Sequence, residues 1–78
     1  MTTSIKKVIA YHISRLQDKN RDVRLKAIAE LSHMPDQEAF NALRAVFEND
    51  EDNEVRKAAQ EAGRNMFLKL KEQDGANS

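Results

Sequence analysis

The chain has 78 residues, no cysteine, and thirteen basic residues balanced by thirteen acidic ones. A chain of this length makes one small domain and leaves no room for a second. The lack of cysteine excludes disulfides and thiolate chemistry, and the zero net charge gives no overall field that would draw the protein to nucleic acid or to an anionic membrane.

The composition favours helix along nearly the whole chain. Alanine, leucine and long charged side chains are frequent, whereas the chain has two glycines and one proline, so we expect an all-α fold. The N-terminal residues lack the apolar run of a signal peptide, and no stretch approaches the roughly 20 apolar residues of a membrane span. We therefore expect a cytoplasmic protein that binds neither membrane nor nucleic acid.

The first two predicted helices span residues 4–17 and 22–33. Apolar residues recur at helical spacing in the first helix, which predicts a buried face formed by Ile5, Val8, Ile9, Ile13 and Leu16. Apolar residues cover about two thirds of the circumference of the second helix, so we expect it to contact neighbours on several sides. These apolar residues are Val23, Leu25, Ala27, Ile28, Ala29 and Leu31.

The third and fourth predicted helices span residues 35–48 and 53–71. Pro35 cannot continue the second helix but suits the first turn of the third. The predicted core residues are Phe40, Leu43, Val46 and Phe47 in the third helix, and Val55, Ala59, Ala62, Met66 and Leu70 in the fourth. Residues 1–72 are thus expected to form one domain, followed by a flexible C-terminal tail over residues 73–78.

One segment of the sequence recurs after 32 residues, so that residues 18–27 match residues 50–59. Each copy consists of a polar turn and the beginning of the second or fourth predicted helix. The identical pairs are Asp18 and Asp50, Val23 and Val55, Arg24 and Arg56, and Ala27 and Ala59. A period of this length on a helical pattern is typical of stacked helical hairpins, each of which buries its apolar face only against a neighbour.

These residues resemble the HEAT-repeat family, and most closely its phycobilisome-lyase-like (PBS lyase) variant, whose repeats carry an Asp, a short acidic turn, Val-Arg and a downstream Ala. The resemblance extends from the first helix to the middle of the fourth, and it implies two HEAT-like hairpins stacked as a short four-helix solenoid. It also implies that Asp18, Arg24, Asp50 and Arg56 form a hydrogen-bonded ladder between the repeats. The first helix departs from the pattern, as a capping unit would, because its apolar residues do not superimpose on Phe40, Leu43 and Phe47.

Polar residues of the fourth helix predict that the repeats end there. The positions of Leu25, Ile28 and Ala29 are taken by Lys57, Gln60 and Glu61 in the fourth helix. The side on which a third repeat would stack is therefore expected to be polar, as in a capped array. The alternative is that the three apolar residues are ordinary core residues of a four-helix bundle.

No group of residues has the spacing of a catalytic, cofactor or metal site. His12 and His33 lie on different predicted helices without carboxylates at metal-ligand spacing. The acidic run that starts at Asp50 resembles a calcium-binding loop, but Val55 stands where that loop needs glycine. We therefore predict a protein that is not an enzyme and that holds no cofactor.

The family resemblance implies a protein-protein interaction module, an adaptor or regulatory binder. In HEAT proteins the second helices line a concave surface where partners bind, and the predicted partner face here is polar. It consists of Lys26, Glu30 and His33, joined by Lys57, Gln60, Glu61 and Arg64. The expected partner is another protein or a second copy of the chain. An accessory or regulator of bilin lyase function is the alternative, and a nucleic-acid-binding protein would need a basic concave face that the neutral composition does not supply.

Overall fold

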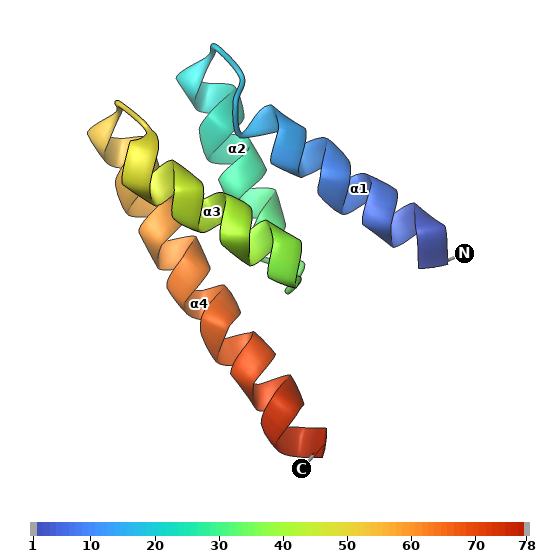
Figure 1. Cartoon of the computed structure of the whole chain (residues 1–78). Coiled ribbons are helices and arrows are strands. Elements are labelled where there is room, and N and C mark those ends of the chain that lie inside the picture. Colours follow the sequence, from blue (N-terminus) through green and yellow to red (C-terminus); the bar gives the residue numbers. More distant parts are fainter. Residues whose placement is uncertain (1, 78) are drawn as a thin grey trace.

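The computed structural model describes the backbone of residues 2–77 and the side chains of residues 5–73. Over this range the chain forms four α-helices and no strand. The helices are α1 (Thr2–Arg15), α2 (Arg21–Leu31), α3 (Gln37–Asn49) and α4 (Asn53–Asn77) (Figure 1). The prediction of an all-α fold is confirmed.

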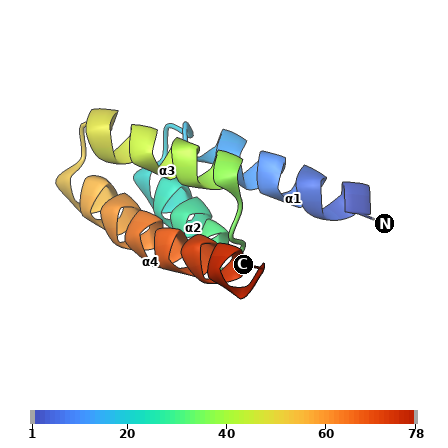
Figure 2. The ribbon, with the colours of Figure 1, turned by 60° about the horizontal axis from the view of Figure 1, so that its bottom comes forward.

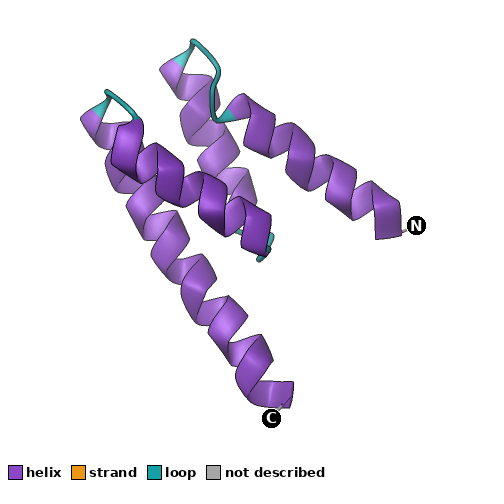
Figure 3. Ribbon diagram, viewed as in Figure 1, coloured by secondary structure: helices purple, strands orange, loops and turns teal. Residues whose placement is uncertain are grey.

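The four helices form two hairpins, α1 with α2 and α3 with α4. Figure 2 shows them in two layers, with α1 and α3 above α2 and α4, and Figure 3 shows that short loops connect them. The closest packing is between α3 and α4, followed by α1 with α2 and α2 with α4. Helix α1 contacts α3 much less, and its N-terminal end lies away from the other three helices (Figure 1).

The core lies between the two layers and takes residues from all four helices. Its buried residues are Ile9, Leu16, Ala27, Ile28, Leu31, Ala39, Leu43, Val46, Val55, Ala59, Ala62 and Met66. The predicted face of the fourth helix is confirmed for its four buried members, and Leu70 packs partly buried against them. In α2, three of the six predicted contact residues are buried, Val23 and Leu25 are half-buried, and Ala29 is exposed.

The predicted buried face of the first helix is wrong over its N-terminal half. Ile9 and Leu16 are buried and Ile13 packs against the core, but Ile5 is 63% exposed and Val8 is 45% exposed. The reason is that the N-terminal end of α1 lies away from the other helices (Figure 1), which leaves the apolar side chains of its first turns largely uncovered. Helical periodicity predicts an apolar face correctly, but it does not show that another element packs on it.

The first helices of the two hairpins superimpose when a different shift is used. Ile9, Ile13 and Leu16 each lie 30 residues before Ala39, Leu43 and Val46, which occupy the same core positions. The shift is 32 for the second helices because two additional residues separate Val46 from the turn at Asp50. The mismatch predicted from Phe40 and Phe47 therefore reflects an insertion at the end of α3 and not an atypical α1.

Several predicted helix boundaries change. The third helix begins at Gln37 and not at Pro35, since the Asp36 carboxylate accepts the N–H of Ala39 at 3.1 Å and caps α3. Helices α1 and α2 end two residues before the predicted positions. Helix α4 continues to Asn77, because no proline stops it and Gly75 costs a helix only about 1 kcal/mol. The backbone of residues 73–77 of the predicted tail is thus helical, and Ser78 lies outside the described residues.

Candidate functional site

The two turns that precede α2 and α4 are built in the same way. Asp18 Oδ1 accepts the N–H of Asn20, and Asp50 Oδ1 accepts the N–H of Asp52, each at 2.9 Å. Asn20 then caps α2, and Asp52 accepts the N–H of Val55 at 3.0 Å at the start of α4. Short polar side chains favour both kinds of bond, so the turn chemistry of the repeat sets where each second helix begins.

The repeated arginines close these turns from the helix side. Arg24 Nη1 donates to the carbonyl oxygen of Asp18 at 2.8 Å and to that of Lys19 at 3.2 Å. Arg56 Nη1 donates to the carbonyl oxygen of Asp50 at 2.6 Å, over the same spacing of six residues. Each guanidinium therefore satisfies carbonyl groups that no helix would satisfy.

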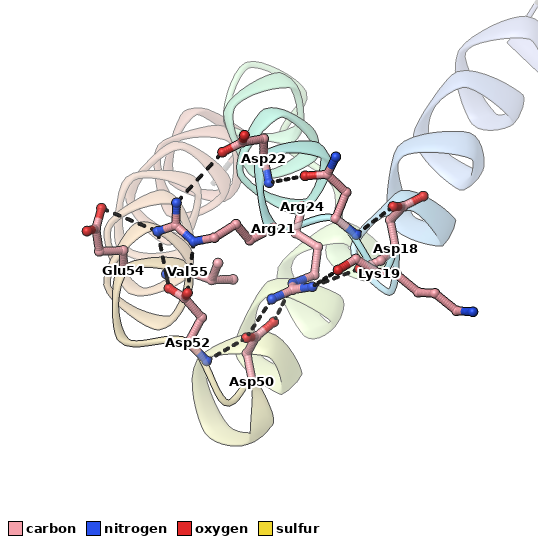
Figure 4. Close-up of polar contacts among 10 residues, drawn as sticks. Asp18, Lys19, Arg21, Asp22, Arg24, Asp50, Asp52, Glu54 and Val55 are labelled. Carbon is pink, nitrogen blue, oxygen red and sulfur yellow. Dashed lines mark hydrogen bonds and ion pairs between the residues drawn. The ribbon is translucent and has the colours of Figure 1, made fainter.

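Arg24 also reaches across to the second repeat, where it meets the carboxylate of Asp50 (Figure 4). Its Nη2 donates to Asp50 Oδ1 at 3.4 Å, and its Nε lies 3.0 Å from Oδ2, outside hydrogen-bond geometry. The two side chains are only 13% and 10% exposed. Of the four predicted ladder residues, the structure thus joins Arg24 and Asp50 directly. The Asp18 carboxylate instead lies 3.5 Å from Arg15, and Arg56 bonds within its own repeat.

Three further ion pairs between the repeats escaped the sequence analysis. Arg21 Nε donates to Asp52 Oδ2 at 2.8 Å, and Lys6 Nζ donates to Asp36 Oδ1 at 2.9 Å. Arg21 Nη2 also lies 3.6 Å from Glu54 Oε2. Asp36 and Asp52 sit at the starts of α3 and α4, so each carboxylate also satisfies a backbone N–H there. The residues of the Lys6–Asp36 and Arg21–Asp52 pairs are 30 and 31 positions apart, close to the repeat length. This spacing is the sequence signal by which the two pairs could have been predicted.

The ion pairs between the repeats all share one polarity among the side chains of residues 5–73. Lys6, Arg21 and Arg24 supply the cations from the first repeat, and carboxylates of the second repeat receive them. The junction between the hairpins is therefore electrostatically directional, with cations on the leading face of one repeat and carboxylates on the following repeat.

The contact with Arg21 shifts the ionisation of Asp52. The hydrogen bond from the guanidinium and the bond from the Val55 N–H lower the pKa of Asp52 from 3.8 to about 2. In the same way, the hydrogen bond from Lys6 lowers the pKa of Asp36 below 3.8. Because each folded pKa lies below the unfolded value, each ionised carboxylate stabilises the fold above about pH 4.

We expect Asp52→Asn to lower the melting temperature at pH 7, and the deficit to vanish as the pH falls towards 2. Asparagine keeps the helix cap but loses the ion pair with Arg21, and the wild type loses the same pair as Asp52 becomes protonated. Circular dichroism melts of both proteins between pH 2 and pH 7 measure this. Glu51→Gln at an exposed position of the same turn is the charge-matched control. A deficit that is equal at both ends of the pH range would contradict the assignment.

The residues of the predicted partner face lie on α2 and α4, which share one layer of the molecule (Figure 2), and His33 lies just after the end of α2. Lys26 and Glu30 line a hollow between α1 and α2, together with Tyr11, His12 and Arg15. Glu61 lines a second hollow between α2 and α4, and Gln60 and Arg64 line a groove between α3 and α4. His33 and Lys57 are exposed. The hollows thus divide five of these seven residues into three groups, and the partner face as a whole stays a prediction.

The groove between α3 and α4 is the feature that sequence reasoning missed, and we call it the end groove. It is lined by Phe40, Arg44 and Phe47 of α3 and by Ala59, Gln60, Gly63, Arg64 and Phe67 of α4. The residues of α4 that face α2 are others, among them Ala58, Ala62 and Asn65. The end groove therefore lies on the side of α4 away from α2, where a third repeat would stack.

Aromatic side chains change the predicted character of this end of the molecule. Phe47 is 40% exposed, so the prediction that it belongs to the core is wrong. Phe67 of α4 is 52% exposed. Among Lys57, Gln60 and Glu61, which predicted a polar cap, only Gln60 lines the groove. The end face of the second repeat therefore has an aromatic and cationic groove. The cap prediction did not include it, because that prediction considered α4 alone and left out the side chains of α3.

Gly63 lies inside α4 at the base of the end groove. Its φ is helical, and a Cβ built on it would meet nothing within 4 Å. We therefore expect Gly63→Ala to raise the free energy of unfolding by about 0.5–1 kcal/mol, measured by urea denaturation. Ala45→Gly on the exposed face of α3 is the opposite control and should lower it by a similar amount. An unchanged or reduced stability of Gly63→Ala would show that the chain itself needs the glycine.

No group of three or more His, Asp or Glu side chains among the described residues is placed to hold a metal ion. None of the four helices, as far as they are described, is both long and apolar enough to cross a membrane.

Comparison with known proteins gives one match. A family model described as HEAT repeats matches residues 3–63. No curated protein and no solved structure matches the chain.

Proposed function

The chain belongs to the HEAT-repeat family, and from this we propose that it is a small protein-binding module with a non-catalytic, adaptor or regulatory role. HEAT repeats in general are protein-interaction scaffolds, built from hairpins like α1–α2 and α3–α4. The observation that carries the proposal is the end groove, in which Phe47 and Phe67 remain exposed on two rigidly paired helices. Exposed aromatic side chains that gather in a groove mark interaction sites more often than isolated ones do.

The ionisable groups support a binding role over a catalytic one. The groups with shifted pKa values are Lys6, Arg21, Asp36 and Asp52. Each belongs to an ion pair that joins the two repeats, and both carboxylates also accept backbone N–H groups at the start of a helix. Stability of the junction accounts for these shifts without a reacting substrate.

Capture of a partner tests the proposal. The immobilised full-length protein is incubated with a lysate of the source organism, retained proteins are identified by mass spectrometry, and each is purified and titrated by calorimetry. We expect at least one protein to bind with a defined stoichiometry. Beads that carry no protein are the control for non-specific adhesion. Retention of the same proteins by both kinds of beads, or no retained protein at all, would contradict a specific binding role.

The two alternative functions have direct tests of their own. The phycobilisome-lyase-like assignment depends on the Asp, Val-Arg and Ala pattern alone, and it predicts that a bilin titration changes the absorbance spectrum of the pigment. A nucleic-acid function predicts a gel shift whose strength falls steeply with salt. The protein-binding proposal predicts neither result.

A further inference from the structure

The floor of the end groove is aromatic. The ring centroids of Phe40 and Phe67 lie 6.1 Å apart across α3 and α4, which is within the range of favourable aromatic pairs. Phe47 lies two turns further along α3 on the same face as Phe40, and both residues line the groove. The groove thus has an apolar strip along α3 and one large apolar side chain on α4.

Gly63 leaves room at the base of this groove. It occupies the repeat position of Leu31, which the neighbouring helices bury completely. Gly63 has no side chain there, and nothing else in the chain fills the space that a Cβ would occupy. Glycine weakens a helix, and no contact within this chain requires one at position 63. Its missing side chain permits the backbone of another molecule to approach α4 closely.

The charges that line the groove are all positive. Arg44 and Arg64 are the charged residues among its lining side chains, and none of the described lining residues is acidic. Arg44 Nε lies 3.5 Å from Glu48 in an exposed pair on the same helix. Arg64 makes no ion pair with any side chain in the described range 5–73. The end groove therefore contains one arginine, Arg64, that is not paired with a carboxylate among the described side chains, and one, Arg44, whose only described partner is exposed.

The junction between the two repeats shows how such a face is complemented. There, Arg21 and Arg24 of the first repeat meet the carboxylates of Asp52 and Asp50, which lie in the turn between α3 and α4. Arg56 is the repeat equivalent of Arg24 and has no carboxylate partner among the described side chains. The second repeat thus has cations on the side away from the first repeat. The first repeat has its cations on the side that faces the second repeat.

We propose that the end groove binds an amphipathic helix of a partner protein, with apolar residues at i, i+3, i+4 and i+7 flanked by aspartate or glutamate. This proposal deepens the proposed function and rests on it. A helix fits because the groove lies between two adjacent helices and continues their packing. Its apolar residues cover Phe47 and Phe67, and its carboxylates pair with Arg44 and Arg64.

A second copy of this chain is a poorer occupant on grounds of charge. Two end grooves placed face to face bring Arg44 and Arg64 of one copy against those of the other. The hollow between α1 and α2, at the opposite end, presents Arg15 and Lys26 with Glu30 as its one carboxylate. Neither self-association supplies an acidic surface, and like charges at an interface disfavour both.

A peptide-display selection against the full-length chain tests the proposal. The library holds helical peptides of about 20 residues with a fixed apolar stripe, in which each flanking position is Glu, Lys or Gln. We expect glutamate to be enriched at the flanking positions. Selected peptides should bind at least about tenfold more weakly to Phe47→Ala/Phe67→Ala and to Arg44→Glu/Arg64→Glu. The control Lys57→Glu/Lys69→Glu makes the same change in charge outside the groove and should alter binding by less than about twofold.

The outcomes separate this proposal from the proposed function. Peptides that bind both groove variants as tightly as the wild type overturn the groove assignment, and a lysate partner that still binds leaves the proposed function standing. Enrichment of lysine, or no binding peptide at all, also overturns the proposal. Sedimentation velocity tests whether a second copy of the chain occupies the groove. A wild-type dimer that is dissociated by Phe47→Ala/Phe67→Ala would assign the groove to a second copy and overturn the proposal. Both phenylalanines are exposed, so circular dichroism should show the variants folded.

Discussion

Replacement of Arg24 by alanine is expected to lower the free energy of unfolding by about 3–5 kcal/mol, because it leaves the Asp50 carboxylate without its cation. Asp50 is only 10% exposed, and water cannot fully replace the guanidinium there. The substitution also removes the hydrogen bonds to the carbonyl oxygens of Asp18 and Lys19. One side chain thus holds the turn of its own repeat and the turn of the next.

The repeat provides a matched control at Arg56. This residue occupies the same position in α4 and bonds the carbonyl oxygen of Asp50, but it pairs with no carboxylate among the described residues. Arg56→Ala is therefore expected to cost much less than Arg24→Ala. Urea denaturation followed by circular dichroism measures both, and equal losses would show that the contact between the repeats contributes little.

A double-mutant cycle isolates the contact itself. Asp50→Asn keeps an oxygen that can accept the N–H of Asp52 but removes the charge that faces Arg24. The loss in Arg24→Ala/Asp50→Asn should therefore be smaller than the sum of the two single losses. Additive losses would contradict direct coupling between the two side chains.

The helices and the repeat were predictable because their signals are local. A polar turn, a Val-Arg pair and an apolar face recur within each hairpin, and short-range chemistry is sufficient to form each of them. The caps at Asn20 and Asp52 follow the same logic, since each side chain bonds a backbone N–H two or three residues ahead. The family match over residues 3–63 agrees with this part of the prediction.

The candidate site was not predictable in the same way, because it depends on which faces neighbours cover. The periodicity of α3 places Phe47 on the apolar face of the helix together with Leu43. In the structure Leu43 is buried, whereas Phe47 is 40% exposed. Val8 in α1 is a similar case, since it lies towards the end of α1 that is away from the other helices and is therefore exposed. Arg64 was assigned to a concave stripe with Lys26, whereas the packing places the two residues in separate hollows. A wheel drawn for each helix contains no information on the angles between helices.

Leu43→Ala is expected to lower the free energy of unfolding by about 2–5 kcal/mol, since it opens a cavity where α3 packs against α4. Leu43 is fully buried, and α3 with α4 is the closest helix pair in the molecule. A chain of 78 residues has a total stability of about 4–12 kcal/mol, so this one substitution removes a large share of it.

Leu68→Ala is the control for Leu43→Ala, because it removes the same atoms from a side chain that is 55% exposed. Its effect is expected to stay within about 0.5 kcal/mol. Urea denaturation of both variants measures the difference, and similar losses would contradict the burial of Leu43. A large loss in Leu43→Ala with a small one in Leu68→Ala would also support the design of the groove experiment. It would show that side chains on the outer faces of α4 can be changed without unfolding the hairpin that carries them.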